Sequence, residues 1–463
     1  MEMTNNRLSR ISKLFLDRDN ITVDLALAQR KSFQIGLQCG GDVARSRTLQ
    51  LAILTAASLA ARCFPEAATA ILEPAVADAP NLVWPSLGES FGQTLAVLLG
   101  SERLASHSSF TSRTARIVTF GNGPAAPHAL RATFDGWTAK VAPAAVTPAL
   151  PQREFCSLSG VLVGAISVAE LFLSFAELNI AAGRRSVELS LWRPDLTITD
   201  PLALGPPVEY LPKALWALGL GHLGNSYLWS VASLPYPTGN TGTIYLNDFD
   251  KVETDNWETG IIFSRDDVDH LKTRVCSRWL EARGFVTRCI ERPFDSNFRR
   301  RTDESALAFS GFDSNEVRRD LVTAQFGRVM DSGLGGTKDN FDTIGFHAWP
   351  NSRSPEELWP VQTADERENE RKLHERIARE NPSYSVIGGD LCGRALLAGK
   401  SVAVPFVGAV ASTLVVAETL RLLHGGPAYT DMKLSLSDLS QRFARTNGSY
   451  SASDLPGIDA IAV

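Results

Sequence analysis

The clearest pattern of apolar and polar positions lies between residues 214 and 232. An apolar run, ALWAL at 214–218, is followed by the turn GLGHLG at 219–224 and then by YLWSVA at 227–232. A short apolar run that ends at glycine is typical of a buried strand, and the next segment has the composition of a helix. The pattern predicts a strand, a glycine turn and a helix, which together bind phosphate groups at a helix N-terminus.

Apolar runs alternate with helical patterns on both sides of a connector, DPLALGPP at 200–207, whose three prolines and glycine cannot sustain a helix. Such alternation predicts the α/β class with mostly parallel sheets. GVLVGAISVAE at 160–170 and GAVASTLVVAE at 408–418 are related by a constant offset of 248 residues. We therefore expect a duplicated α/β domain. Two unrelated core helices rich in alanine and valine are the alternative.

The first half has its own candidate turn in KSFQIGLQCGGDVARS at 31–46. Its glycines, Gly36, Gly40 and Gly41, do not have the G-x-G-x-x-G spacing, and no D-x-D follows a second strand. We expect this copy to have lost the nucleotide chemistry and to serve as a structural or docking partner.

Composition narrows the class of protein. The 463 residues are 44% hydrophobic and 21% charged, as in ordinary globular proteins, and the net charge of −5 argues against a protein that binds nucleic acid through phosphate contacts. The start lacks the apolar core of a secretory signal. The most apolar stretch, 401–416, is shorter than the roughly 18–20 residues that a bilayer requires, so we predict a buried helix and no membrane span.

The six cysteines include no C-x-x-C pair, which makes a structural zinc site or a disulfide framework unexpected and favours a reducing cytoplasm.

Polar residues that follow the glycine turn decide between two nucleotide chemistries. A single acidic residue after the second strand, here TIYL at 243–246, suffices to bind the ribose of NAD. This chain has two carboxylates there, followed by an asparagine, a lysine and a further aspartate after an apolar strand. Such groups can neutralise a triphosphate and stabilise a pentavalent α-phosphate, so they favour ATP and adenylation over a dehydrogenase. The residues are Asp248, Asp250, Asn256, Lys272 and Asp313.

This ordered set resembles the ThiF/MoeB and ubiquitin-activating-enzyme family. The family pattern is a glycine turn, D-x-D-x-V-E-x-x-N-L-N-R-Q, a lysine, and a strand that ends in D-N or D-S. Here the run is DFDKVETDNWETG at 248–260, with Lys272 and Asp313-Ser314 downstream. The match covers residues 210–350 well and the helix near 405–424 fairly. The first half matches as a degenerate copy.

The resemblance implies two Rossmann-like ThiF-type adenylation domains, the first degenerate and the second active, and a role for each matching residue. ATP and Mg²⁺ would be the cofactors. Asp248 would hold the ribose, Asp250 would lie near the nucleotide, and Asp313 would bind magnesium. The phosphates would contact Gly219, Gly221, Gly224, Asn256 and Lys272.

One departure from the family pattern concerns a phosphate-binding charge. The family's arginine and glutamine in N-L-N-R-Q are Thr259 and Gly260 here. Either another arginine replaces the missing one or activity is impaired. The family also uses an arginine finger within R-Y-S-R-Q, and RLSRI at 7–11 places Arg10 in that position.

A thioester requires an accessible thiol, and Cys392 lies in GGDLCG at 388–393, sixteen residues before Gly408. It is similar to the catalytic cysteine of compact activating enzymes, which also precedes the last helix. We interpret Cys276 and Cys289 as core residues. The preceding insertion, Pro355 to Glu380, is dense in charge from 365 onward and predicts a solvated helix or mobile crossover segment.

These expectations divide the chain into an inactive adenylation domain at 1–200, an active one at 208–350 and 400–463, and a crossover at 351–400 with the catalytic cysteine. The expected function is activation of a ubiquitin-like protein for transfer to a conjugating enzyme, as in bacterial Bil or CBASS antiviral systems. No nucleic acid or membrane is expected as a partner, and a homodimer is one possible assembly. The alternatives are a sulfur-carrier adenylyltransferase, a non-catalytic scaffold and a nicotinamide dehydrogenase.

Overall fold

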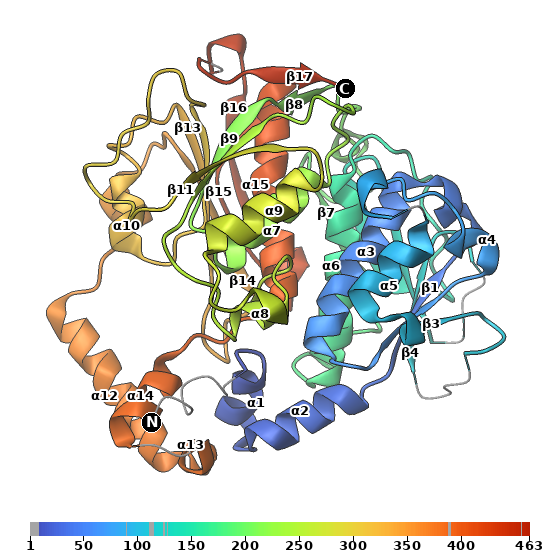
Figure 1. Cartoon of the computed structure of the whole chain (residues 1–463), viewed down its shortest axis with the longest axis horizontal. Coiled ribbons are helices and arrows are strands. Elements are labelled where there is room, and N and C mark those ends of the chain that lie inside the picture. The colour runs from blue at the N-terminus through green and yellow to red at the C-terminus, as the bar shows by residue number, and fades with distance from the viewer. Residues whose placement is uncertain are drawn as a thin grey trace.

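Two β-sheets, with helices packed between them, organise the chain in a computed structural model that describes residues 9–88, 90–110, 115–123, 126, 128–387, 390–454 and 456–463 (Figure 1). The first half supplies a seven-stranded sheet and the second half an eight-stranded sheet. The predicted mixed α/β class is confirmed.

The first sheet is parallel from β3 to β5 and antiparallel from β5 to β7. Its order is β3-β2-β1-β4-β5-β6-β7, so the chain crosses over between β3 and β4. The strands are β1 (Ile35–Cys39), β2 (Ala68–Ile71), β3 (Leu104–Ala105), β4 (Arg116–Phe120), β5 (Leu130–Asp135), β6 (Thr138–Pro143) and β7 (Val187–Ser190).

The second sheet repeats this order strand for strand and adds one strand at the end, in the order β11-β10-β9-β12-β13-β14-β15-β16. It is parallel from β11 to β13 and antiparallel from there on. The strands are β9 (Ala214–Leu218), β10 (Thr243–Asn247), β11 (Val286–Ile290), β12 (Leu307–Ser310), β13 (Arg328–Leu334), β14 (Thr343–Trp349), β15 (Pro427–Ser435) and β16 (Phe443–Ser449). A small separate sheet pairs β8 (Tyr210–Pro212) with β17 (Ala460–Ala462).

Four long helices lie between the two sheets and bury their apolar residues there (Figure 1). They are α3 (Arg47–Cys63), α6 (Leu158–Phe175), α7 (His222–Ala232) and α15 (Pro405–Leu423). Polar side chains also cross between the halves, because the Trp229 indole donates to Thr55 Oγ1 at 3.1 Å. The predicted internal repeat appears as α6 and α15, which take corresponding places beside their sheets.

Two of these helices, α6 and α15, are long and apolar enough by length and composition to cross a membrane, with mean hydropathies of 1.9 and 1.6. However, 89% and 94% of their apolar windows are buried inside the protein, which agrees with the interpretation of core helices. The helix expected near 405–424 is confirmed, since α15 spans Pro405–Leu423 and so extends past the most apolar stretch at 401–416. The helix continues to Leu423 because the charge of Arg421 is buried against Glu418, so a charged residue does not end the buried stretch.

Shorter helices complete the two halves. The first half has α1 (Ser12–Asp19), α2 (Val23–Ser32), α4 (Pro74–Ala77) and α5 (Phe91–Leu99). The second half has α8 (Asn256–Thr259), α9 (Lys272–Glu281), α10 (Asn315–Asp320) and α11 (Pro355–Leu358).

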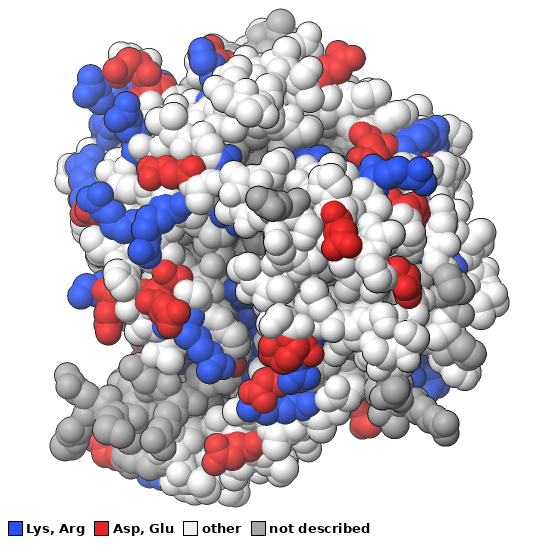
Figure 2. All heavy atoms as spheres, turned by 45° about the vertical axis from the view of Figure 1, so that its right-hand side comes forward, with Lys and Arg blue, Asp and Glu red and all other residues white. Residues whose placement is uncertain are grey.

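Three further helices form a projection that we call the arm: α12 (Ala364–Glu380), α13 (Pro382–Ile387) and α14 (Leu391–Gly399). The charged segment predicted from residue 365 onward is helical, and Ala378 is its buried residue. Figure 1 shows the arm next to α1, at the end of the molecule where α15 begins. Charged side chains gather over the second half at the left of Figure 2, whereas the face of the first half is largely uncharged.

Candidate active site

The glycine turn follows β9 directly and leads into α7, as the sequence predicts. Gly219 has φ +75°, a conformation that side chains rarely adopt, and a Cβ at Gly224 would lie 1.9 Å from the Gly219 carbonyl oxygen. Gly311, after β12, approaches the same carbonyl, since a Cβ there would lie 2.7 Å from it. A Cβ at Gly221 would meet nothing within 4 Å. The turn is therefore tightly packed at its base and open at Gly221.

Asp248, at the end of β10, fixes the turn. Its Oδ2 accepts a hydrogen bond from the Leu220 N–H at 2.7 Å, and its Oδ1 accepts one from the Asp250 N–H at 2.8 Å. Burial raises the pKa of this carboxyl, although Lys272 opposes the shift. Each carboxylate oxygen keeps a further lone pair, so a ribose hydroxyl can still donate to it.

Asp250 and Lys272 form an ion pair beside the turn. Lys272 Nζ lies 3.1 Å from Asp250 Oδ2, and the Lys272 N–H donates to the Asp250 carbonyl at 3.0 Å. The lysine side chain is 11% exposed and the aspartate side chain 53% exposed. A largely buried ammonium is thus held at the rim of the site, where it can interact with a phosphate group.

Asn256 begins α8, and its side chain is used partly within its own loop. Its Oδ1 accepts from the Glu253 N–H at 2.9 Å, while its Nδ2 makes a long contact of 3.4 Å with Asp255 Oδ1. Thr259, which stands in the position of the family's arginine, is 6% exposed and turned into the protein. No phosphate contact is therefore available from Thr259.

Arginines from the first half hold α8 in place. The Arg62 guanidinium donates to the carbonyls of Trp257, Gly260, Ile261 and Phe263 at 2.9–3.1 Å. These contacts fix a loop of the second half from a helix of the first.

A second buried arginine of the first half is Arg30, which is 0% exposed. Its Nη1 lies 3.3 Å from Glu258 and 3.0 Å from the hydroxyls of Ser9 and Ser12. Because these serines flank Arg10, Arg30 connects α8 to the segment that carries Arg10.

Arg10 lies beside Asp255, the residue that precedes α8. Its Nη1 is 3.8 Å from Asp255 Oδ2, which also contacts Lys400 Nζ at 3.3 Å. Burial lowers the pKa of His222, the first residue of α7, to about 4, and the charge of Arg10 adds to this shift. The structure therefore brings the predicted Arg10 to this region, although Arg7 of the same motif is outside the described residues.

Asp313 is an exposed residue after β12, immediately before the Ser314 that caps α10. Among the residues that the structure describes, no group of three or more His, Cys, Asp or Glu side chains is placed to hold a metal ion. Asp313 could supply one oxygen ligand, and a magnesium ion that keeps water and phosphate ligands suits a site with few protein ligands.

Cys392 is the exposed cysteine among the six, and it is the second residue of α14. The Asp390 side chain caps this helix by accepting from the Gly393 N–H at 2.8 Å. The glycines predicted to flank the cysteine, Gly388 and Gly389, are outside the described residues. Burial raises the pKa of the thiols of Cys39, Cys63, Cys156 and Cys276, which fits structural roles.

Cys289 was interpreted as a core residue, but it is only half-buried because it lies on β11, the edge strand of the second sheet. Burial still raises the pKa of its thiol.

The arm is anchored to the first half through Tyr384. The Tyr384 hydroxyl accepts from Lys13 Nζ at 2.8 Å and donates to Asp17 Oδ1 at 2.6 Å, and Asn381 Nδ2 donates to the Leu16 carbonyl at 2.9 Å. At the other end of the arm, Lys400 pairs with Asp255, which precedes α8. The arm that carries Cys392 is therefore held to the first half at one end and next to α8 at the other.

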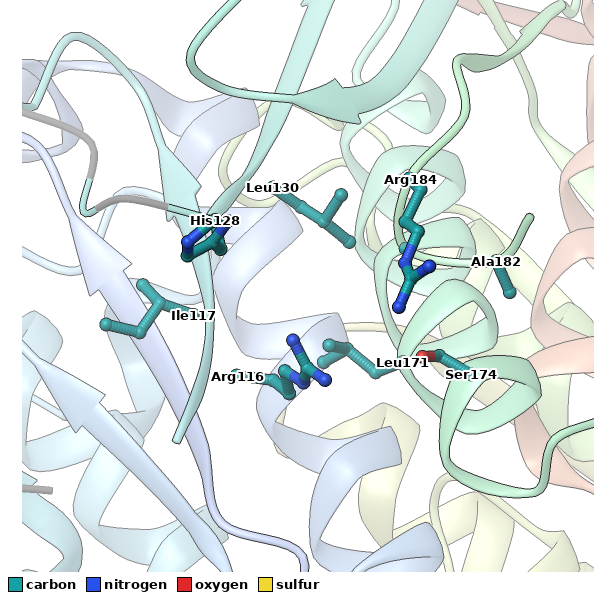
Figure 3. A pocket seen from close by; sticks show the side chains of 9 residues that line it. Arg116, Ile117, His128, Leu130, Leu171, Ser174, Ala182 and Arg184 are labelled. Carbon is teal, nitrogen blue, oxygen red and sulfur yellow. The ribbon is translucent and has the colours of Figure 1, made fainter. Parts of the chain in front are cut away.

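Sequence reasoning missed the residues that connect these parts. Arg30, Arg62 and Lys400 stand in ordinary helical or loop patterns, and Asp255 was passed over within the motif. Only their contacts with segments far away in the sequence identify them. The basic cavity in Figure 3, lined by Arg116, His128 and Arg184, lies by the first residue of β4 and is a separate feature.

Comparison with known proteins identifies the family. Residues 34–191 match the BilD N-terminal domain, and residues 211–426 match the BilD C-terminal domain. The bacterial E1-like protein BilD of Collimonas sp. (strain OK412) is 30% identical over 434 residues, which cover 93% of this chain and 91% of that protein. The chain belongs to the BilD family of bacterial E1-like proteins. This confirms the predicted resemblance.

Solved structures of E. coli MccB are more distant. One is 17% identical with a TM-score of 0.35, over 52% of this chain and 63% of MccB. Another, MccB with ATP, is 14% identical with a TM-score of 0.36, over 70% of this chain and 95% of MccB. Likeness at these levels carries no argument about the site.

Proposed function

We propose that this BilD-family chain activates a ubiquitin-like protein by adenylating its C-terminal carboxylate with ATP. The observation that carries the proposal is the open turn at Gly221 with Asp248 fixed at its base and the Asp250–Lys272 pair at its rim. An open helix N-terminus beside a held ammonium suits a triphosphate. The E1-like name of the relative supports the same reaction.

In the first step, an oxygen of the carboxylate attacks the α-phosphorus, and the bond from that phosphorus to pyrophosphate breaks. Lys272 and the α7 N-terminus stabilise the added negative charge. We assign a further cationic role to Arg10, which comes from the start of the chain and lies 3.8 Å from Asp255, beside α8. Asp313 is the residue that we assign to Mg²⁺, which would neutralise charge on the triphosphate.

In the second step, the Cys392 thiolate attacks the acyl carbonyl, AMP leaves, and the thiol proton passes to solvent. The exposure of Cys392 at the start of α14 supports this role, since the acyl group must reach an accessible thiol. A conjugating enzyme would then accept the acyl group. We place the active adenylation domain at 208–350 and 400–463, the degenerate one at 1–200 and the crossover at 351–400, in a cytoplasmic antiviral conjugation system.

Incubation of the chain with a ubiquitin-like protein, ATP and Mg²⁺ tests both steps. Pyrophosphate exchange into ATP reports the first, and an adduct that disappears with reducing agent reports the second. We expect Cys392→Ala to lose the adduct and keep the exchange. A reducible adduct that survives in Cys392→Ala would assign the thioester to another residue.

Thr259 favours one competing function, a non-catalytic scaffold, because its buried side chain leaves the family's phosphate-binding arginine without a local replacement. A scaffold predicts no ATP binding at millimolar concentration. Equilibrium dialysis with labelled ATP separates the two functions, since the proposed enzyme must bind ATP before any partner is added.

A further inference from the structure

The two halves can be aligned residue by residue at their turns. The sheets have the same strand order, so β1 corresponds to β9 and β4 to β12. β1 ends at Cys39 and β9 at Leu218, which sets Asp42 in the place of Gly221. The first half thus has a carboxylate at the position where the second half has a glycine with open space around it.

The Asp42 carboxylate fills the turn of the first half. The Asn122 N–H, in the loop after β4, donates to Asp42 Oδ1 at 2.9 Å and to Oδ2 at 3.0 Å. A Cβ at Gly121 would lie 2.2 Å from Asp42 Oδ1, and a Cβ at Gly40 would lie 2.7 Å from the same atom. Glycines therefore surround this carboxylate closely on two sides, as they would surround a bound oxyanion.

A second carboxylate occupies the N-terminus of α3, the counterpart of α7. Glu154 accepts from the Thr48 hydroxyl at 3.2 Å and from the Thr48 N–H at 3.4 Å, and it also accepts from the Ser46 hydroxyl. Ser46 in turn caps the helix by accepting from the Leu49 N–H at 3.1 Å. The positive end of the α3 dipole is thus already compensated by the chain itself.

In the second half, the backbone N–H groups at the start of α7 are free for a ligand. The cap of α7 is Gly221, and no side chain of the described residues caps this helix. A nucleotide phosphate in the first half would face Asp42 and Glu154, whereas in the second half it would face Lys272 and uncapped backbone N–H groups. Like charges at such short range disfavour binding in the first half.

We propose that Asp42 is a built-in anion that occupies an oxyanion cradle in the first half, while Glu154 compensates the N-terminus of α3, so that the chain binds one nucleotide, at the turn of the second half. The nucleotide part rests on the proposed function. The cradle itself does not, because it depends only on the contacts of Asp42 with the loop after β4. Removal of the Asp42 carboxylate therefore creates a site for a small oxyanion.

Exchange of the two residues tests the assignment of the turns. Gly221→Asp places the carboxylate of the first half in the second, at a residue with φ −71° and open space, so the fold tolerates it. Gly221→Asn is the matched control, since it has the same size without the charge. We expect Gly221→Asp to bind ATP at least about tenfold more weakly than Gly221→Asn. Equal affinities would overturn the charge argument.

Anion rescue tests the cradle, with ATP in excess to saturate the second half. Asp42→Ala should lower the thermal midpoint, and 20 mM sodium phosphate or formate should restore it in part, whereas sodium chloride of equal ionic strength should not. Asp42→Asn, which keeps the size of the side chain, is the second variant if Asp42→Ala does not fold, and it should gain less from phosphate. A midpoint of Asp42→Ala that responds equally to phosphate and chloride would overturn the proposal.

Titration of the unmodified chain with a non-hydrolysable ATP analogue should give one site per chain. Two sites would overturn the inference while the proposed function stands. No binding would contradict the proposed function, and the rescue of Asp42→Ala by phosphate would still decide whether the cradle exists.

Discussion

Replacement of Arg62 by methionine tests whether the first half shapes the nucleotide site. The guanidinium donates to four carbonyls of the loop at 257–263, and the side chain is 7% exposed. Methionine keeps much of the apolar stem but leaves those carbonyls without a donor. Loss of a buried, charged donor from such a network costs about 3–5 kcal/mol of unfolding free energy. Because the loop includes Thr259 and adjoins Asn256, we also expect a weaker affinity for ATP.

The matched control is Arg47→Met. Arg47 is the half-buried first residue of α3, and desolvation lowers its pKa to about 10, as it does for Arg62. Its guanidinium donates to the carbonyls of Ser233 and Leu234, at the end of α7 that is remote from the turn. Urea unfolding should show a loss of stability in both variants. Calorimetry should show a loss of ATP affinity, by about tenfold, in Arg62→Met alone. Equal ATP affinities in the two variants would refute the role of Arg62 at the site.

Three further predictions concern other parts of the account. Lys272→Ala should lower pyrophosphate exchange by about 10²–10³-fold, because an ammonium at the phosphates is lost, with an unchanged circular dichroism spectrum; retained exchange would contradict the assignment. Burial lowers the pKa of His222 to about 4 in the folded chain. As the pH falls below about 6.5, this histidine therefore takes up a proton in the unfolded chain before it does so in the folded chain. The free energy of unfolding should accordingly drop by about 2 kcal/mol between pH 7 and pH 5. Urea unfolding of His222→Gln should show a smaller drop, and an identical pH dependence would exclude this histidine as the cause. Tyr384→Phe removes the hydroxyl that anchors the arm and should lower the free energy of unfolding by about 1 kcal/mol. Because the arm carries Cys392, we expect thioester formation to be slower and pyrophosphate exchange to be unchanged. A loss of exchange would instead place Tyr384 in the first step.

The sequence predicted local structure well where one segment carries the whole signal. The strand at Ala214–Leu218, the turn and the helix α7 follow from apolar runs and glycines that are adjacent in the chain. The repeat between α6 and α15 was visible because buried helices of this kind are apolar throughout.

The sequence could not predict contacts between distant segments. Arg62 is one of many arginines in the sequence, and its role depends on a loop that is 195 or more residues away. Similarly, Asp42 stands in a turn whose spacing indicated only that the nucleotide motif was absent. Its contact with the Asn122 N–H depends on how β1 and β4 pair, and this pairing is not visible in the sequence.

The accessibility of Cys392 was expected from its flanking glycines, of which Gly388 and Gly389 are outside the described residues and Gly393 lies within α14. The structure supports exposure for a different reason, since the residue lies on the outer face of the arm's last helix. The extent of α15 was predictable, but the burial of its charged pair, Arg421 with Glu418, was not, because it depends on how the helix packs between the sheets.

The most direct test of the account is pyrophosphate exchange into ATP, measured with and without the ubiquitin-like protein. Adenylation at the turn of the second half predicts exchange that depends on that protein, persists in Cys392→Ala and disappears in Lys272→Ala. Exchange that is equally fast in Lys272→Ala, or absent from the unmodified chain with a bound ubiquitin-like protein, would contradict it.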